Sequence, residues 1–208
     1  MRIAGTLTDV SWCARKKELL IDSSPAMWEK TFDEFLHQRI QTRYLDPIKA
    51  IDKINKDRGE GFSVVALFCT LFEFLEGCEC GLNFDKAAKP GEAHKYGLNK
   101  GVIKGSQLFN DFLNREPFKT LLGTHISTFY SDVRCGLLHE ARPCGRWKVR
   151  TSGPAGVLVQ AYGKDIILYR DQLEPALDKY LAGYRARLSV DAKLQENFMT
   201  KWDHLSKP

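Results

Sequence analysis

Apolar residues recur at helical spacing along most of the chain, so helices are the main predicted elements. Ser24 and Pro25 supply a helix cap followed by proline at the first helical position, and an apolar stripe runs on to Tyr44. Asp46–Pro47 repeats this start signal, so the helix either kinks there or ends and restarts before continuing to residue 54. Residues 1–23 are expected to be irregular or weakly stranded.

The next predicted helix, residues 62–77, is apolar nearly all round and should be the most buried element. Residues 77–97 are rich in small residues and lysine, which favours a flexible loop. A short helix is expected over residues 104–114. This order of elements indicates a helical protein organised around one central helix.

The helix predicted over residues 121–141, here called the motif helix, has two different faces. Its core side is a stripe of four apolar residues: Ile126, Phe129, Val133 and Leu137. Arg134 and His139 lie about 140° apart on the helical wheel. Between them the face carries Ser131, Cys135 and Leu138 rather than the lysine and glutamate of a solvated face. This face is therefore expected to meet a partner.

Beyond the motif helix, Pro143, Cys144 and Gly145 stop the helix and the pattern becomes β-like. Alternating and β-branched residues over 147–168, separated by glycine-rich turns, predict a small β-ribbon of two or three strands. Helices resume near residue 171 and end near residue 205. We therefore expect a mainly α fold, a helical bundle with a β-ribbon inserted after the motif helix, in a single domain spanning residues 1–208.

Composition narrows the functional classes. A net charge of +5 permits an RNA partner through phosphate attraction. No signal peptide is visible at the amino terminus, and the apolar run 62–75 is too short for a membrane span and contains Glu73. Six cysteines without an export signal indicate reduced thiols and a cytoplasmic protein. The cysteines at 78, 80, 135 and 144 match no usual zinc spacing, so no metal is expected.

Arg134 and His139 form an R-x-x-x-x-H motif near the end of a helix, which resembles the signature of the HEPN superfamily. The acid-bearing apolar run 69–76 resembles the helix that these proteins pack against their motif helix. Residues 197–203 also resemble the end of stand-alone members. The resemblance covers roughly residues 24–205 in the order of elements, but only these short runs in residue detail.

The resemblance implies a metal-independent endoribonuclease without a cofactor. Many prokaryotic HEPN proteins have this activity in toxin–antitoxin, abortive-infection and CRISPR-associated defence, so an antitoxin or a defence-system partner is a possible companion. Such proteins typically form homodimers across the motif helix and build a composite site there. The expected products carry 2′,3′-cyclic phosphate and 5′-OH ends.

The residue types suit this chemistry. Histidine transfers protons near neutral pH, so His139 is the candidate acid–base group. Arginine keeps its charge and binds phosphate through two parallel hydrogen bonds, so Arg134 is the candidate phosphate ligand. A buried glutamate needs a partner, and Glu73 is expected to hold the Arg134 guanidinium in place. Because each chain supplies one such histidine, a two-fold dimer would bring two pairs into one cleft.

Two positions depart from the family pattern. Cys135, a candidate supporting residue, stands where the nucleases often have Asn, Asp or His, and Ala141 stands where the subgroup silenced by adenylylation has tyrosine. The same face also suits a non-catalytic module that binds RNA, a nucleotide or a protein partner. Two further alternatives are a solvated face with Asp132 or Glu140 as partners and a Cys135–His139 nucleophilic pair.

Overall fold

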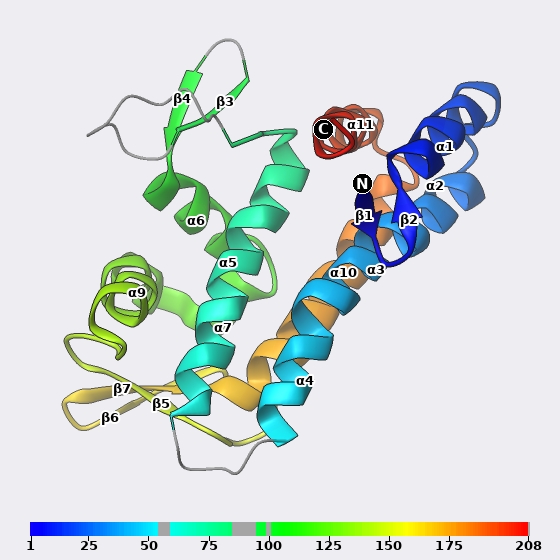
Figure 1. Ribbon diagram of the computed structural model, residues 1–208. Helices are drawn as coiled ribbons and strands as arrows, with labels where there is room; N and C mark the ends of the chain where they lie inside the picture. The colour runs from blue at the N-terminus through cyan, green and yellow to red at the C-terminus, as the bar shows by residue number, and fades with distance from the viewer. Residues whose placement is uncertain (54–58, 85–94, 99–100, 208) are drawn as a thin grey trace. The chain divides into compact units, whose positions relative to one another are not determined.

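The computed structural model describes residues 1–53, 59–84, 95–98 and 101–207, and these residues form a mainly α structure, as predicted (Figure 1). Its contacts group into two compact units, each assembled from separate stretches of the chain. Unit 1 comprises Met1–Pro47, Phe74–Gly105 and Ala182–Pro208. Unit 2 comprises Ile48–Glu73 and Ser106–Leu181. That the chain is one domain stays a prediction.

Unit 1 is built around an aromatic cluster in which Trp12 lies 5.3 Å from Phe35 and 6.0 Å from Trp202, between ring centroids. Its elements, in chain order, are β1 (Arg2–Ala4), β2 (Leu7–Thr8), α1 (Asp9–Ile21), α2 (Pro25–Thr31), η1 (Phe32–His37), α3 (Gln38–Ile40), η2 (Gln41–Leu45), the end of α5, β3 (Lys95–Leu98), β4 (Gly101–Lys104), the end of α10, and α11 (Ala192–Leu205). The strands form two separate two-stranded sheets, β1–β2 and β3–β4.

Residues 1–23 were expected to be irregular or weakly stranded, and the short strands β1 and β2 agree with this, whereas helix α1 corrects it for residues 9–21. The helix begins after Thr8, whose backbone N–H donates a hydrogen bond to the Ser11 hydroxyl at 3.1 Å. Its buried side contains Arg15 among apolar residues, because Arg15 is neutralised by Glu18 and Glu34 at 2.8 and 2.6 Å. A charged residue in the middle of a buried stripe hides the helical pattern from a search for apolar periodicity.

The helix that begins at Pro25 continues across Asp46, which has helical backbone angles (φ −64°, ψ −45°). Helix α4 (Asp46–Lys53) follows directly after the π-helical segment η2. Proline removes a backbone donor, and a wider π turn is one way in which a helix accommodates such a change. Residue 54, the predicted end of this helix, lies outside the described residues.

Helix α5 (Glu60–Cys80) is the buried helix that the sequence predicts, and it extends beyond the expected bounds at both ends. Val65, Leu71 and Leu75 are completely buried. Within the described ranges it is the one helix long and apolar enough to cross a membrane, yet 56% of its apolar stretch is buried inside the protein. The loop predicted over 77–97 therefore begins only after Cys80, and residues 85–94 of it lie outside the described part.

Unit 2 holds the motif helix and the sheet. Its elements, in chain order, are α4, the start of α5, α6 (Gly105–Leu113), α7 (Phe118–Leu122), η3 (Gly123–His125), α8 (Ile126–Thr128), η4 (Phe129–Cys135), α9 (Gly136–Glu140), β5 (Trp147–Arg150), β6 (Val159–Tyr162), β7 (Asp165–Tyr169), η5 (Arg170–Gln172) and α10 (Leu173–Leu188). Its core centres on Phe72, whose ring lies 4.8 Å from those of both Phe112 and Phe118.

The motif helix is shorter than predicted and consists of α8, η4 and α9. The chain leaves helical geometry at Gly123 (φ 54°, ψ −129°), so the helix starts near Ile126 rather than at residue 121. It ends at Glu140, because Ala141 adopts a left-handed conformation (φ 53°). The expected stop at Pro143 to Gly145 therefore lies beyond the true end of the helix.

The segment after the helix end, residues 141–146, is here called the return segment. It folds back along the motif helix, and the Cys144 backbone N–H donates a hydrogen bond to the Asp132 carbonyl at 2.7 Å. A Cβ atom on Gly136 would lie only 2.7 Å from the Arg142 carbonyl oxygen and 2.9 Å from the Cys144 nitrogen. Glycine at this position is what allows the two backbones to approach so closely.

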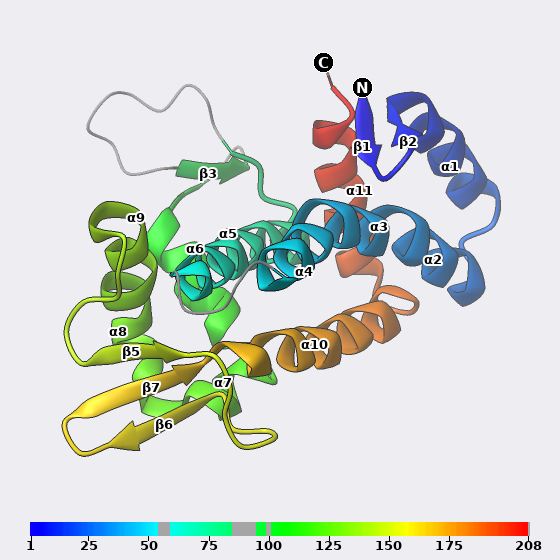
Figure 2. The same ribbon diagram turned by 60° about the horizontal axis from the view of Figure 1, so that its bottom comes forward.

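The β-ribbon predicted over residues 147–168 is confirmed as a three-stranded sheet in the order β5–β7–β6 (Figure 2). Strands β6 and β7 are antiparallel, whereas β5 and β7 are parallel. Trp147 of β5 packs its ring edge-on against Phe129, 5.2 Å away, and its indole nitrogen donates a hydrogen bond to Thr128 at 3.1 Å. The sheet is thereby attached to the first part of the motif helix.

Replacing Gly136 by alanine should destabilise the protein, since the new methyl group would overlap backbone atoms of the return segment. We expect a loss of about 1–3 kcal/mol in the free energy of unfolding, measured by urea denaturation. The matched control is Gly183→Ala in α10, where a Cβ meets nothing within 4 Å and alanine favours the helix. Equal stability of the Gly136→Ala variant and the wild type would contradict the proposed close approach.

Candidate functional site

The core side of the motif helix is formed by Phe129, Val133 and Leu137, which are all buried. Ile126, the fourth residue of the predicted stripe, is only half-buried, because the helix begins there. The three buried residues are spaced four apart, and the segment from Phe129 to Cys135 is π-helical. A π turn is wider than an α turn, so it holds residues four apart closer to one line on the core side.

The opposite face of the helix is small and apolar, as predicted. Ser131 and His139 are exposed and Cys135 is half-buried. Leu138 is 51% exposed, which is a large apolar side chain left in water at the centre of this face. The face therefore offers one exposed apolar side chain beside the small side chains of Ser131 and Cys135.

Glu73 of α5 binds Arg134, as the sequence analysis expected. The Arg134 Nε donates a hydrogen bond to Glu73 Oε1 at 3.0 Å, and Arg134 Nη2 lies 3.0 Å from the same oxygen. The two side chains are only 18% and 13% exposed. The guanidinium carbon also lies 5.4 Å from the centre of the Tyr130 ring. These contacts fix the position of the arginine from two directions.

The surroundings of Arg134 keep it charged. Burial alone would lower the pKa of its guanidinium, but attraction by Glu73 and further neighbours outweighs burial and raises that pKa overall. Burial raises the pKa of the Tyr130 hydroxyl, although Arg134 opposes this. Burial likewise raises the pKa of the Cys69 thiol. Tyr130 and Cys69 therefore stay neutral at physiological pH, and neither of them supplies an anion that would compete for the Arg134 cation.

One edge of the guanidinium remains available. The ion pair engages Nε and Nη2, and no acceptor among the described residues binds Arg134 Nη1. An arginine carries five N–H donors, so donors are left for a further anion. Arg134 can thus stay bound to Glu73 while it contacts a phosphate.

His139 lies in the last turn of α9, on the exposed side of the helix. Within the described part of the chain it forms no hydrogen bond or ion pair with Arg134, Glu73 or Cys135. The structure therefore brings Glu73 and Arg134 together and leaves the His139 imidazole open to an approaching molecule. A Cys135–His139 nucleophilic pair has no hydrogen bond to support it among the described residues.

The six cysteines are free, and the described residues contain no group of three or more His, Cys, Asp or Glu side chains arranged to hold a metal ion.

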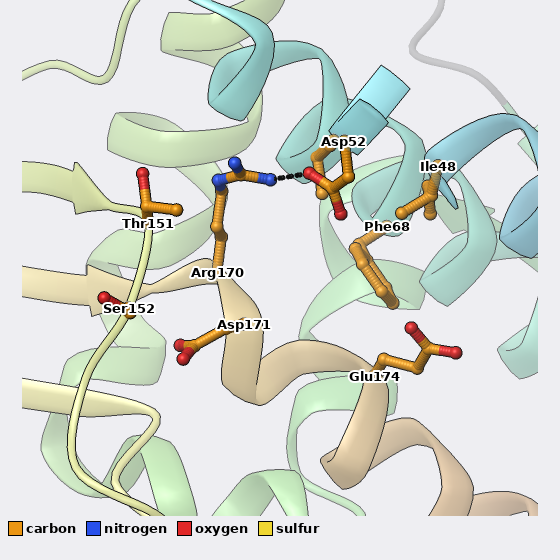
Figure 3. A pocket seen from close by; sticks show the side chains of 9 residues that line it. Ile48, Asp52, Phe68, Thr151, Ser152, Arg170, Asp171 and Glu174 are labelled. Atoms are coloured by element: carbon orange, nitrogen blue, oxygen red, sulfur yellow. Dashed lines mark hydrogen bonds and ion pairs between the residues drawn. The ribbon is translucent and has the colours of Figure 1, made fainter. Parts of the chain in front are cut away.

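A second candidate site, which the sequence analysis missed, surrounds Arg170 at the end of β7 (Figure 3). A hollow of about 310 Å³ is lined by apolar, hydroxyl and acidic side chains: Ile48, Asp52, Val64, Phe68, Thr151, Ser152, Arg170, Asp171 and Glu174. Arg170 is only 5% exposed and points to Asp52, with which it forms an ion pair. Arg170 also forms an ion pair with Glu60, in which Arg170 Nη2 lies 3.5 Å from Glu60 Oε1.

The charges around Arg170 largely satisfy one another. Asp52 and Glu60 bind Arg170, Glu174 binds Lys49 at 3.1 Å, and Asp171 accepts a hydrogen bond from the Gly153 backbone. These contacts tie the end of β7 to α4 and α5 and give the hollow a structural explanation. No spacing rule links residues 52, 60 and 170, because each comes from a different element, so the sequence alone gave no signal for it.

The Glu73–Arg134 pair should be strongly coupled because both groups are largely removed from water. In a double-mutant cycle with Glu73→Gln and Arg134→Gln, each single change should cost about 1–3 kcal/mol of unfolding free energy. The coupling energy should be about 1–2 kcal/mol.

The matched control is the Lys193–Glu196 pair, whose side chains are 72% and 67% exposed at a distance of 2.7 Å. Its coupling should stay below about 0.5 kcal/mol. If the two pairs show the same coupling, Glu73 does not fix Arg134 in the way that these contacts indicate.

The chain matches no known protein-family model, no curated protein and no solved structure.

Proposed function

We propose that this protein is a metal-independent endoribonuclease of HEPN type with a composite site at a homodimer interface. The observation that carries the proposal is Arg134, held by Glu73 at 3.0 Å, at the edge of an exposed apolar face that also bears His139. RNA cleavage without a metal requires a cation for the phosphate and a group that transfers protons, and Arg134 and His139 are residues of these two types on one helix.

In the proposed reaction the ribose 2′-oxygen attacks the adjacent phosphorus and the bond to the 5′-oxygen breaks. One His139 takes the proton from the 2′-hydroxyl, and Arg134 stabilises the extra charge on the phosphorane. A second histidine gives a proton to the departing 5′-oxygen. The products are a 2′,3′-cyclic phosphate and a 5′-hydroxyl, so no water or redox partner is consumed in this step.

The second histidine comes from a second copy of the chain. A two-fold axis along the face formed by Ser131, Cys135 and Leu138 would place two Arg134–His139 pairs on opposite sides of one cleft. Burying Leu138 there supplies a hydrophobic contact, and the small side chains of Ser131 and Cys135 permit close approach of the two helices. Cys135 then acts as a supporting residue through its size rather than through hydrogen bonding.

We place the protein in the cytoplasm as a toxin or antiviral defence effector, with an antitoxin or another defence component as a partner. Two features support the cytoplasmic location: all six cysteines are free thiols, and 56% of the apolar stretch of α5 is buried in the protein. The biological role follows from the HEPN resemblance and depends on the nuclease activity proposed above.

A second function is favoured by one observation, namely that Cys135 replaces the polar residue common in the nucleases. In that case the same face binds RNA, a nucleotide or a protein partner without cleaving it. Arg134 would then contribute binding energy, and His139 would be a contact residue rather than an acid–base group. The two functions differ in whether RNA fragments with new ends are produced.

The test is incubation of purified protein with total RNA in excess EDTA, followed by end-group analysis of the fragments. Wild type should release cyclic-phosphate ends, and Arg134→Ala and His139→Ala should each lower the rate by about 10²-fold or more. The control variant is His37→Ala, because His37 is also an exposed helical histidine but lies in unit 1.

Cleavage that persists in folded Arg134→Ala and His139→Ala proteins would contradict the assignment of these residues. Intact RNA with all four proteins, together with RNA binding that Arg134→Ala weakens, would favour the non-catalytic module.

A further inference from the structure

Exposed cations gather on the return segment and on the sheet that follows it. Five of them share this region of unit 2 and form no ion pair with a carboxylate among the described residues: Arg142, Arg146, Lys148, Arg150 and Lys164. Elsewhere in the unit, Arg134, Arg170 and Lys49 are bound to Glu73, Asp52 and Glu174, whereas the scattered lysines Lys53, Lys119 and Lys179 form no ion pair among the described residues. The region thus carries positive charge that the protein itself does not neutralise.

Strand alternation places two of these cations on the outer face of the sheet. Trp147 is buried and packs against Phe129 of the motif helix, so this side of β5 faces the helix. Lys148 and Arg150 alternate with the inward residues and are exposed. They lie on the face of the sheet that is turned away from the motif helix.

An exposed aromatic side chain lies on the same face. Lys148 is in register with Ile167 of β7, and Ile167 is in register with Gln160 of β6. Tyr162 is two residues after Gln160 and therefore points to the same side. It is 71% exposed, whereas the central Ile167 and Tyr169 are buried, and the Tyr169 hydroxyl donates a hydrogen bond to Gln160 at 2.8 Å. The middle of this face is therefore covered, with Gly153 lying against the Tyr169 ring. Its exposed groups lie at the two edges, Lys148 and Arg150 on β5 and Tyr162 on β6, where Tyr162 is in register with Asp165.

We propose that this outer face, together with the return segment, binds single-stranded RNA. Lysine and arginine that form no ion pair attract the phosphates of a nucleic-acid backbone. Arg146 also donates a hydrogen bond from Nε to the Lys164 carbonyl, which leaves the other nitrogens of its guanidinium for a phosphate. An exposed tyrosine stacks on a base only when the base is not already stacked in a duplex. The combination of unpaired cations and a free ring therefore selects a single strand.

The position of this surface connects it to the proposed nuclease site. The return segment starts directly after α9, which ends with His139 and Glu140, and leads into β5. RNA held along Arg142 and Arg146 would be held next to the end of the motif helix. This inference deepens the proposed function by naming how the substrate is held. Delivery of RNA to His139 rests on the proposed nuclease function, whereas binding of RNA by the sheet does not depend on it.

The test is a fluorescence anisotropy titration of a labelled 12-nucleotide single-stranded RNA of mixed sequence. The His139→Ala protein is the parent, so that the RNA stays intact. Adding Lys148→Glu and Arg150→Glu should weaken binding at least about 10-fold. It should also reduce the slope of log K against log salt concentration by about 1.4, or 0.7 for each lost phosphate contact on a single strand.

Tyr162→Ala in the same parent should weaken binding about 5- to 100-fold while leaving the salt slope unchanged, because it removes stacking rather than charge. The matched control carries Lys17→Glu and Lys207→Glu, two exposed lysines of unit 1, and should bind as the parent does at moderate salt. Circular dichroism and thermal unfolding check that every variant is folded.

The outcomes separate this inference from the nuclease proposal. If the Lys148→Glu/Arg150→Glu protein and the control bind RNA equally with equal salt slopes, the sheet surface is overturned, whatever the cleavage result. If the parent does not bind RNA even at low salt, the inference is also overturned. If the sheet variants lose binding while wild-type protein cleaves no RNA, the surface stands and the nuclease proposal fails.

Discussion

The guanidinium of Arg134 is largely removed from water, and a buried cation needs a counter-charge close by. Glu73 provides it from α5 at 3.0 Å, and the Tyr130 ring covers the arginine from the motif helix itself. The candidate site depends on this interaction, since it determines where the cation lies and which of its donors remain open. Without Glu73, Arg134 would lose its counter-charge and one of the two contacts that fix its position.

The motif helix and the return segment shape the surface around this fixed charge. The π-helical segment keeps Phe129 and Val133 on the core side, and Gly136 allows the return segment to lie against the helix. The left-handed Ala141 ends the helix immediately after His139 and Glu140. As a result, the imidazole lies at an exposed helix end, and the chain then leads into a sheet whose outer face carries unpaired cations.

Sequence patterns predicted the parts of the fold that depend on local periodicity and on simple charge rules. The central helix, the β-ribbon and the Glu73–Arg134 contact follow from an apolar run, from alternation and from the cost of an unpaired buried glutamate. Helix α1 was missed because Arg15 interrupts its buried stripe, and the break at Gly123 was missed because the flanking residues continue a helical pattern. The ion pairs of Arg170 were missed because long-range partners leave no spacing in the sequence.

The central claim is that one site is shared between two copies, and mixing wild-type protein with an inactive variant tests it most directly. Wild-type and His139→Ala proteins are combined in equal amounts, and RNA cleavage in EDTA is compared before and after proven subunit exchange. Because the proposed reaction needs one histidine from each copy, a mixed dimer should be inactive, and exchange should lower the cleavage rate to about half of its value before exchange. An unchanged cleavage rate after demonstrated exchange would contradict a shared site.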